Sequence, residues 1–334
     1  MTCRTSSVIL PCFILVAGCF CATTAAANTS QGQIFVAQWN TGVNDGAIGA
    51  YTLSGSPINS SLVSGLNQPE GLATDGKGNL FVANLSYRTV GQYTTSGGVV
   101  NPSLISDLPG WVWGVAVDSD GFIYLSDWDH GTIGKYTSSG AAVNPTLISG
   151  LRAPTGIAID NSGNLFVANQ SSGTIGKYTT SGQTLNGSLI SGLNNPAQIA
   201  LDGTGNLFVA NYGGVYNGDV GNGSIGKYST SGTPINSALI SGLPDPVGVG
   251  LDGNGHLFVS LVGNNRIAEY TTSGTLVDFS FITGLGDPSS LVIVVPEPSS
   301  LRIGLIGLIG LGLRFGLKRN ENRGFPPRRS GYRW

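Results

Sequence analysis

The chain repeats itself, and this repetition limits its fold more than any other feature. The unit is plainest over residues 156–182, GIAIDNSGNLFVANQSSGTIGKYTTSG, and near-copies of it fill most of the chain. Three short runs rich in Ile, Val and Phe alternate in it with DNSGN and SSG, which are turn sequences. A fourth apolar run, residues 187–191, follows the SG turn. Each unit therefore predicts a four-stranded antiparallel meander.

A tyrosine closes the third run of each unit and gives the number of repeats. It recurs at Tyr51, Tyr93, Tyr136, Tyr178, Tyr228 and Tyr270, at intervals of 42, 43, 42, 50 and 42 residues, so there are six units. The first unit lacks a GIAID run, but residues 288–294, PSSLVIV, follow the last unit where such a run would fall. The prediction is an all-β, six-bladed β-propeller of four-stranded antiparallel blades over residues 31–295, with the first blade closed by the C-terminal strand. An open solenoid would not need that trailing strand.

The GIAID and NLFVAN runs, with their Asp–Gly turns, resemble NHL-repeat propellers. They are also similar to the wider group of six-bladed propellers that includes the senescence-marker-type lactonases and the streptogramin-lyase-like proteins. The resemblance covers about residues 31–295 and implies the fold. Since such propellers include hydrolases, lyases and binding modules, it does not by itself imply an activity.

The N-terminal segment, residues 1–27, is typical of a secretory signal peptide. Arg4 precedes an apolar run over residues 8–20, and small residues follow at 21–27. Residues 15–19, LVAGC, also resemble a bacterial lipobox, which would leave Cys19 as a lipidated first residue. All four cysteines, Cys3, Cys12, Cys19 and Cys21, lie in this segment. The predicted propeller therefore has no disulfide, thiol nucleophile or thiolate metal site.

The C-terminal segment, residues 296–319, resembles a PEP-CTERM sorting signal. It combines the motif Pro296, Glu297 and Pro298 with a short apolar run over residues 303–313 and a basic cluster at 314–319. The resemblance implies a secreted protein of a Gram-negative-type bacterium, held in the inner membrane by this segment until an exosortase-type enzyme processes it. A plain C-terminal membrane anchor is the alternative, and a basic tail, residues 320–334, follows. The expected location is the cell envelope or extracellular matrix.

Charge argues against a nucleic-acid partner. The formal net charge is −2, but residues 28–300 carry seven Lys and Arg against seventeen Asp and Glu, whereas residues 301–334 carry eight against one. The predicted propeller is therefore acidic, while nucleic-acid-binding surfaces are basic.

Two residue types recur with the repeat and invite a functional interpretation. Aspartates end the first runs at Asp75, Asp118, Asp160, Asp202 and Asp252. A ring of calcium ligands is one interpretation, but each carboxylate is expected to accept N–H groups within its own turn. Glycines precede the tyrosines at Gly49, Gly91, Gly134, Gly176 and Gly226, where we expect them to let neighbouring blades approach closely. No cofactor or metal site is predicted from either set.

Catalytic residues are not evident. Only His130 and His256 could act as bases near neutral pH, and they lie in different units. A streptogramin-lyase-like mechanism would need His residues grouped with a Glu, and a lactonase would need a Glu, Asn and Asp metal set, for which Glu70 is the one suitable glutamate. An extracytoplasmic metal-dependent lactonase or lyase therefore stays as the alternative, and no catalytic residue is assigned.

Loop placement gives the clearest functional prediction. In a propeller, the loops between second and third strands and those leading to the next blade emerge on one face. Both insertions, residues 38–47 and 211–223, fall in these loops. Aromatic and acidic residues predicted on that face are Trp39, Glu70, Tyr87, Trp111, Trp113, Asp127, Trp128, Asp129, His130, Tyr212, Tyr216 and Asp219. Such a face could bind a polysaccharide or a protein segment, unless the tryptophans merely plug the channel. The function predicted is a binding or structural module.

Overall fold

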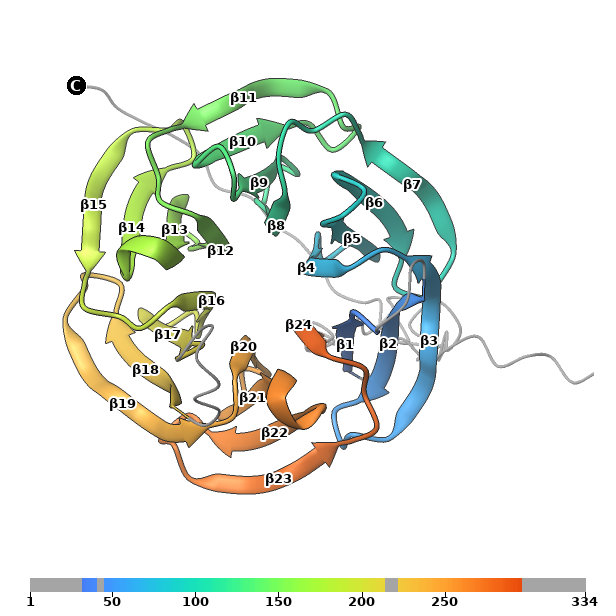
Figure 1. Cartoon of the computed structure of the whole chain (residues 1–334), viewed down its shortest axis with the longest axis vertical. Helices are drawn as coiled ribbons and strands as arrows, with labels where there is room; N and C mark the ends of the chain where they lie inside the picture. Colours follow the sequence, from blue (N-terminus) through green and yellow to red (C-terminus); the bar gives the residue numbers. More distant parts are fainter. Residues whose placement is uncertain (1–31, 41–44, 214–221, 296–334) are drawn as a thin grey trace, which may run out of the picture. The chain divides into compact units, whose positions relative to one another are not determined.

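The computed structural model describes residues 32–40, 45–213 and 222–295. Within these residues, 24 strands form six four-stranded antiparallel sheets, which surround a central channel as blades (Figure 1). This confirms the six-bladed propeller. The predicted signal peptide (1–27), sorting signal (296–319) and basic tail (320–334) lie outside the described residues. Among the residues described, no helix is long and apolar enough to cross a membrane.

The innermost strand of each blade lines the channel. These strands are β24 (Pro288–Val294), β4 (Pro69–Thr74), β8 (Val112–Val117), β12 (Pro154–Ile159), β16 (Pro196–Leu201) and β20 (Pro246–Leu251). The second strands carry the NLFVAN-type runs and are β1 (Gln33–Gln38), β5 (Asn79–Asn84), β9 (Ile123–Asp127), β13 (Asn164–Asn169), β17 (Asn206–Asn211) and β21 (His256–Leu261).

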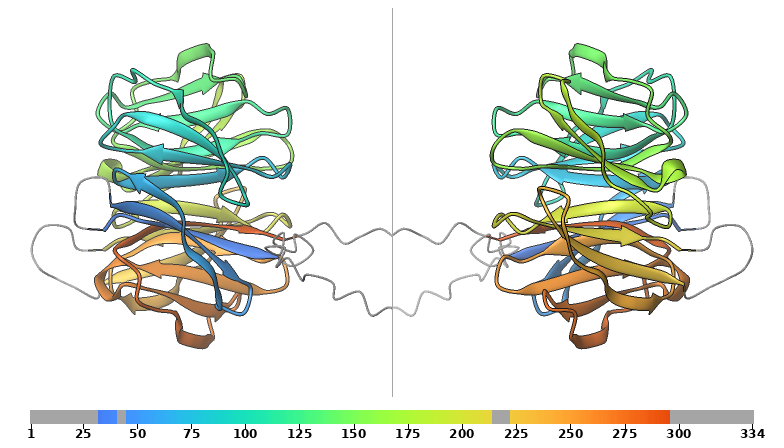
Figure 2. Two further views of the ribbon diagram at one scale, coloured as in Figure 1. Left: turned by 90° about the vertical axis from the view of Figure 1, so that its right-hand side faces the viewer. Right: turned by 90° about the vertical axis from the view of Figure 1, so that its left-hand side faces the viewer.

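The third and outermost strands complete each blade. The third strands are β2 (Gly46–Thr52), β6 (Thr89–Thr94), β10 (Thr132–Tyr136), β14 (Thr174–Thr179), β18 (Gly223–Ser229) and β22 (Arg266–Thr271). The outermost strands are β3 (Pro57–Leu66), β7 (Val99–Ile105), β11 (Ala142–Ile148), β15 (Thr184–Ile190), β19 (Pro234–Leu243) and β23 (Leu276–Ile282). Two short 3-10 helices, η1 (Gln170–Ser172) and η2 (Val262–Asn264), lie between second and third strands. Seen from the side, the strands run between two faces where the loops gather (Figure 2).

The C-terminal strand closes the ring. β24 pairs antiparallel with β1, from Gln33 opposite Val294 to Ala37 opposite Ser290. The first blade therefore has the order β24-β1-β2-β3, as the sequence predicts. Without β24 the inner edge of β1 would be open. Its pairing with β24 prevents this edge from pairing with another chain.

The hydrophobic core lies between the blades. Each second strand buries a large aromatic residue, exposed by 2% or less; these residues are Phe35, Phe81, Tyr124, Phe166, Phe208 and Phe258. Phe166 of β13, for example, belongs to one cluster with Leu207 and Tyr228 of the next blade. Because every blade contributes to the clusters on both sides, the repeat specifies an interlocked ring.

The repeated aspartates hold their own turns, which confirms the structural interpretation. Asp160 Oδ1 accepts the backbone N–H groups of Ser162 at 2.9 Å and Asn164 at 2.8 Å. Asp202 does the same with Thr204 and Asn206, at 2.8 and 3.0 Å.

The expected role of the repeated glycines is wrong. A Cβ at Gly176 would lie 2.5 Å from the Tyr178 hydroxyl, and one at Gly91 would lie 2.7 Å from the Tyr93 ring. The close neighbour is thus the tyrosine of the same strand, whose ring folds back over the glycine. These glycines make room within a blade rather than between blades.

Candidate functional site

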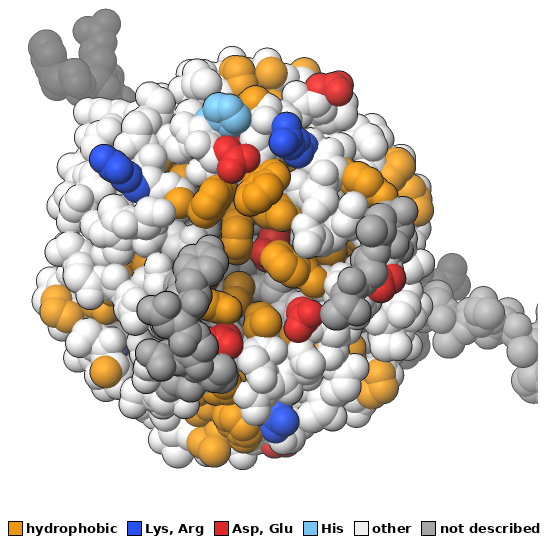
Figure 3. All heavy atoms as spheres, viewed as in Figure 1, with side chains coloured by type: hydrophobic (Ala, Val, Ile, Leu, Met, Phe, Trp, Pro, Cys, Tyr) orange, Lys and Arg blue, Asp and Glu red, His pale blue; other side chains and the backbone are white. Residues whose placement is uncertain are grey.

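A pocket of about 440 Å³ lies at one mouth of the channel, and we call it the mouth pocket. Innermost strands contribute the lining residues Glu70, Trp113, Ala197, Val247 and Ser289. Loops and 3-10 helices contribute Trp39, Trp111, Trp128, Gln170, Tyr212, Val262 and Asp287. On this face hydrophobic side chains gather around the centre with acidic side chains among them (Figure 3). The volume falls within the range of about 300–1,000 Å³ that is usual for small-molecule sites.

The part of the pocket that the innermost strands line is formed by one position of the repeat. Its innermost-strand residues are each the second residue of their strand, so the ring symmetry brings them to the same depth of the channel. The equivalent residue of β12 is Thr155, which is fully buried and lies 3.1 Å from the Pro196 carbonyl oxygen. The residue before it is proline in five of the six strands and the residue after it is glycine in four, whereas this position changes in size and polarity from blade to blade. The variable position therefore makes the pocket asymmetric on a symmetric frame.

Three tryptophans form a stack along one wall. The Trp128 ring lies between those of Trp111 and Trp113, with centroids 5.9 and 6.4 Å apart and planes inclined by about 30°. The Trp128 indole N–H donates to Gln170 Oε1 at 3.2 Å, which fixes the ring against η1 of the neighbouring blade. Trp111 is 41% exposed, so its ring forms the outer edge of the stack. A fixed aromatic wall offers apolar area for a ligand at little entropic cost.

Asp127, Asp129 and His130 hold the loop that carries Trp128 and do not line the pocket. Asp127 Oδ1 accepts the backbone N–H of His130 at 3.0 Å and lies 3.1 Å from its Nδ1. Asp129 Oδ2 accepts the backbone N–H of Trp111 at 3.1 Å. These contacts position the aromatic stack from its outer side.

Glu70 is the most unusual group in the pocket. Its side chain is 3% exposed, and its Oε2 atom is buried without a hydrogen-bond partner. Burial raises the pKa of Glu70 well above its usual value, and the neighbouring Ser289 hydroxyl opposes only part of this rise. The Ser289 hydroxyl itself lies 2.7 Å from the Pro69 carbonyl oxygen. Burial therefore favours a neutral carboxyl group in the wall of the mouth pocket.

Trp39 lies in the loop after β1. Its backbone N–H donates to the Asp287 carbonyl oxygen at 3.2 Å, which fixes the loop to the segment leading into β24. Its indole Nε1 is buried and has no hydrogen-bond partner. In the described part of the chain, the residues that line the pocket thus include one unpaired donor, Trp39 Nε1, and one unpaired oxygen, Glu70 Oε2.

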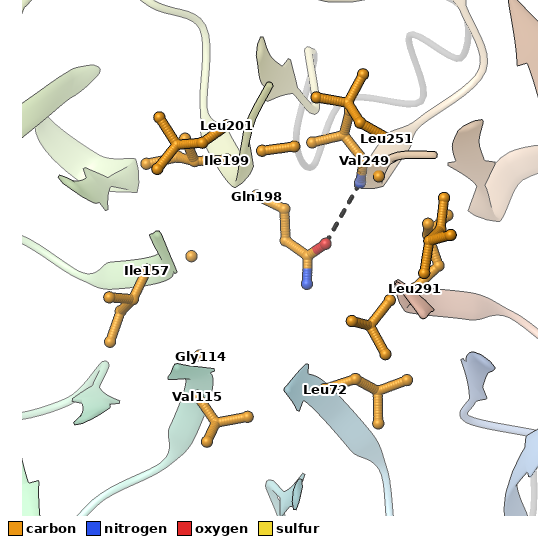
Figure 4. A pocket seen from close by; sticks show the side chains of 15 residues that line it. Leu72, Gly114, Val115, Ile157, Gln198, Ile199, Leu201, Val249, Leu251 and Leu291 are labelled. Atoms are coloured by element: carbon orange, nitrogen blue, oxygen red, sulfur yellow. Dashed lines mark hydrogen bonds between the residues drawn. The ribbon is translucent and has the colours of Figure 1, made fainter. Parts of the chain in front are cut away.

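Gln198 closes the channel below the pocket. It occupies the third position of β16, where β4, β8, β12 and β20 have glycine, and its side chain points into the centre of the channel (Figure 4). Its amide nitrogen donates to Ser290 Oγ at 2.6 Å, and its amide oxygen accepts the Val249 N–H at 3.3 Å. A second cavity of about 210 Å³, lined mostly by aliphatic side chains, lies around and beyond it.

The structure brings together six of the residues predicted on this face, namely Trp39, Glu70, Trp111, Trp113, Trp128 and Tyr212. Asp127, Asp129 and His130 support the stack. Tyr87 is 48% exposed and does not line the pocket, and Tyr216 and Asp219 lie outside the described residues. Sequence reasoning missed Gln170, Asp287 and Ser289, which resemble ordinary turn and strand residues. In the described part of the chain, no three His, Cys, Asp or Glu side chains are grouped as a metal site would require.

No protein family model matches the chain, and no curated protein is similar to it in sequence. Solved structures are similar in fold. A nidogen/laminin complex includes a chain that is 16% identical, with 80% of this chain and 99% of that one covered and a TM-score of 0.65. A protein of unknown function from Bacteroides caccae is 17% identical, with 79% and 99% covered and a TM-score of 0.58.

A streptogramin B lyase is 20% identical, with 77% of this chain and 76% of that one covered and a TM-score of 0.52. Identities at this level show a shared fold and no shared activity. The chain is therefore a six-bladed β-propeller, closed by its C-terminal strand, with a tryptophan-lined pocket at one mouth of its channel.

Proposed function

We propose that this protein is a secreted, surface-retained binding module of the bacterial cell envelope or extracellular matrix, and that its ligand occupies the mouth pocket. The observation that carries the proposal is the ordered stack of Trp111, Trp128 and Trp113 in the wall of a pocket of about 440 Å³. Concave sites that combine apolar aromatic area with a few polar groups are the usual form of ligand sites in proteins.

Preorganisation supports binding as the role of this face. The Trp128 indole N–H is held by Gln170. The Trp111 backbone is held at its N–H by Asp129 and at its carbonyl oxygen by the Trp128 backbone N–H, which donates to it at 2.9 Å. A core plug would need only apolar packing. Hydrogen bonds that fix the Trp128 ring and the Trp111 backbone instead lower the entropic cost of binding a ligand.

Retention at the surface is supported by the two ends of the chain. Residues 1–27 have the composition of a signal peptide, and residues 296–319 resemble a PEP-CTERM signal. Export would place the propeller outside the cytoplasm, and an exosortase-type enzyme would process the C-terminal segment. Fractionation of cells that produce the full chain or a chain ending at Val295 tests this part. We expect release of the shorter protein into the medium, and its retention would contradict the role of the tail.

Screening of the full chain against glycan and protein arrays tests the binding part. Replacement of Trp113 or Trp128 by Ala should abolish any specific signal, because each removes part of the stack. Tyr87→Ala is the matched control, since Tyr87 is an exposed aromatic residue outside the pocket. The ligand should be recovered unchanged after long incubation. Ligands that bind all three variants equally would refute the mouth pocket as a binding site, and a released product would favour an enzyme.

A further inference from the structure

Two unpaired polar atoms belong to residues that line the mouth pocket. Trp39 Nε1 is a donor and Glu70 Oε2 is a carboxyl oxygen, and both are buried without partners. Native proteins pair nearly all such groups, because a buried group without a partner has lost its hydration and gained no hydrogen bond in return. Among the described residues five such atoms occur, and the other three are the Oδ1 atoms of Asn84, Asn169 and Asn211, which do not line the pocket. The two that belong to pocket residues would be paired by a ligand that supplies both a hydrogen-bond acceptor and a hydrogen-bond donor.

We propose that the mouth pocket binds a neutral sugar residue, with its hydroxyl groups pairing with Trp39 Nε1 and the Glu70 carboxyl group and its apolar face lying against the tryptophan stack. The inference rests on the proposed function, since it names the ligand class of the same pocket. A hydroxyl group both donates and accepts, so it can satisfy either atom.

The charged residues of the pocket favour a neutral ligand over an anion or a cation. Among the described residues, the charged ones that line the pocket are Glu70 and Asp287. No Lys or Arg is among these lining residues, which disfavours an anion. A cation would pair with Glu70 and leave the Trp39 N–H without an acceptor. Burial also favours the neutral form of Glu70, which weakens its attraction for a cation.

The aromatic wall fits the apolar side of a sugar ring. Trp128 is fixed between Trp111 and Trp113, and Trp111 continues the wall to the exposed rim. Sugar C–H groups pack on indole faces while the hydroxyl groups around the ring reach polar side chains. Gln170 adds an amide NH₂ group beside this wall, because its oxygen is already used by Trp128. An oligosaccharide could therefore place one residue in the pocket and continue across Trp111.

The test uses the full chain and a fixed set of probes. Neutral hexaoses of the cello, malto, xylo and chito series are compared with tetramethylammonium by titration calorimetry and tryptophan fluorescence at millimolar concentrations. Trp39→Phe removes the N–H donor and keeps an aromatic ring, while Glu70→Gln keeps hydrogen bonding and removes the ionisable group. Tyr87→Phe is the control outside the pocket. Thermal unfolding of each variant reports whether the fold is intact.

We expect at least one hexaose to bind and tetramethylammonium not to bind. Trp39→Phe should weaken the hexaose by about tenfold, whereas Glu70→Gln should retain its affinity within about threefold and Tyr87→Phe should leave it unchanged. Tetramethylammonium binding that Glu70→Gln abolishes would overturn the inference in favour of a cation site.

Failure of every hexaose to bind would also overturn the inference, and so would hexaose binding that Trp39→Phe leaves unaltered. Neither result refutes the proposed function if a protein ligand from the array loses its binding when Trp113 or Trp128 is replaced by Ala. The proposed function fails only if no ligand loses binding in these variants, so failure of the sugar inference and failure of the proposed function can be distinguished.

Discussion

The third and fourth blades end the loop between their second and third strands with the same glycine contact but carry different side chains there. Gly131 and Gly173, in the loops after β9 and β13, have φ values of 63° and 60°, and each carbonyl oxygen accepts the N–H of a leucine, Leu151 or Leu193, at 3.0 Å. A Cβ on either glycine would lie 2.3 or 2.4 Å from the carbonyl oxygen of that leucine. Both loops are therefore closed by the same glycine-dependent contact.

The side chains on these two loops differ. The third blade places Trp128, Asp129 and His130 before its glycine, where the fourth has Gln170, Ser171 and Ser172. At the second position of the innermost strand, the third blade has Trp113 and the fourth has Thr155. The fourth blade supplies one hydrogen bond, from Gln170 Oε1 to Trp128, and the third supplies the aromatic wall. The repeat therefore specifies the scaffold, while a few residues at the loop ends form the site.

The largest expected effects are losses in the free energy of unfolding, and they should differ between a scaffold residue and a site residue. Phe166→Ala in the fourth blade should lower the free energy of unfolding by about 3–5 kcal/mol, because it empties a fully buried position between two blades. Trp128→Ala in the third blade should cost less than about 2 kcal/mol, since Trp128 is only partly buried. Chemical unfolding measures both. An equal loss for the two variants would contradict the comparison and make the tryptophan stack a core plug.

The sequence predicts the scaffold well because each blade repeats the same local information. Six tyrosines count the blades, and the strand at 288–294 falls where the first blade needs one. The site was predictable only in part. Glu70 and Trp113 stand out as individual residues, but their shared place becomes visible only when the second residues of the innermost strands are aligned. Unpaired atoms such as Glu70 Oε2 depend on contacts between blades, which no local pattern reveals.

The role of the repeated glycines shows another limit of sequence reasoning. A small residue indicates that something approaches closely, but not what approaches it. At Gly176 the neighbour is Tyr178 of the same strand, because the ring folds back along the blade. Side-chain direction, and not repeat spacing, decides such contacts.

Glu70→Gln should stabilise the protein at neutral pH by about 1–3 kcal/mol, which sharpens the contrast between site and scaffold. Burial holds the pKa of Glu70 well above its usual value of 4.5 in the folded state. The folded protein therefore binds the proton more tightly, and stability falls as pH rises from about 4.5 toward the raised pKa. The variant lacks this loss. Thermal unfolding across pH should show its advantage above pH 4.5 and not below; an advantage at all pH values would refute the assignment.

Gln198→Gly restores the residue that four other innermost strands have at this position. It removes the hydrogen bonds to Ser290 and Val249, at 2.6 and 3.3 Å, and should cost about 1 kcal/mol. Affinity at the mouth pocket should stay within about twofold, since the tryptophan stack and Glu70 are untouched. Chemical unfolding and calorimetry measure the two effects. A large loss of affinity would show that Gln198 is the floor of the binding site rather than a closure of the channel below it.

The smallest expected effect concerns a scaffold turn that the site does not use. Burial alone would raise the pKa of Asp202, but the hydrogen bonds from Asn206 and Thr204 hold it below its usual value of 3.8. A lowered folded-state pKa contributes stability that is present above 3.8 and is lost as pH falls through the folded pKa. Asp202→Ala should therefore cost about 1 kcal/mol at neutral pH, and the difference from the unmodified protein should shrink in acid. Asp202→Asn, which keeps an oxygen for the backbone N–H groups, should lose less and show no such pH dependence. Binding at the mouth pocket should be identical in all three proteins, and a change in affinity would contradict the separation of turn and site.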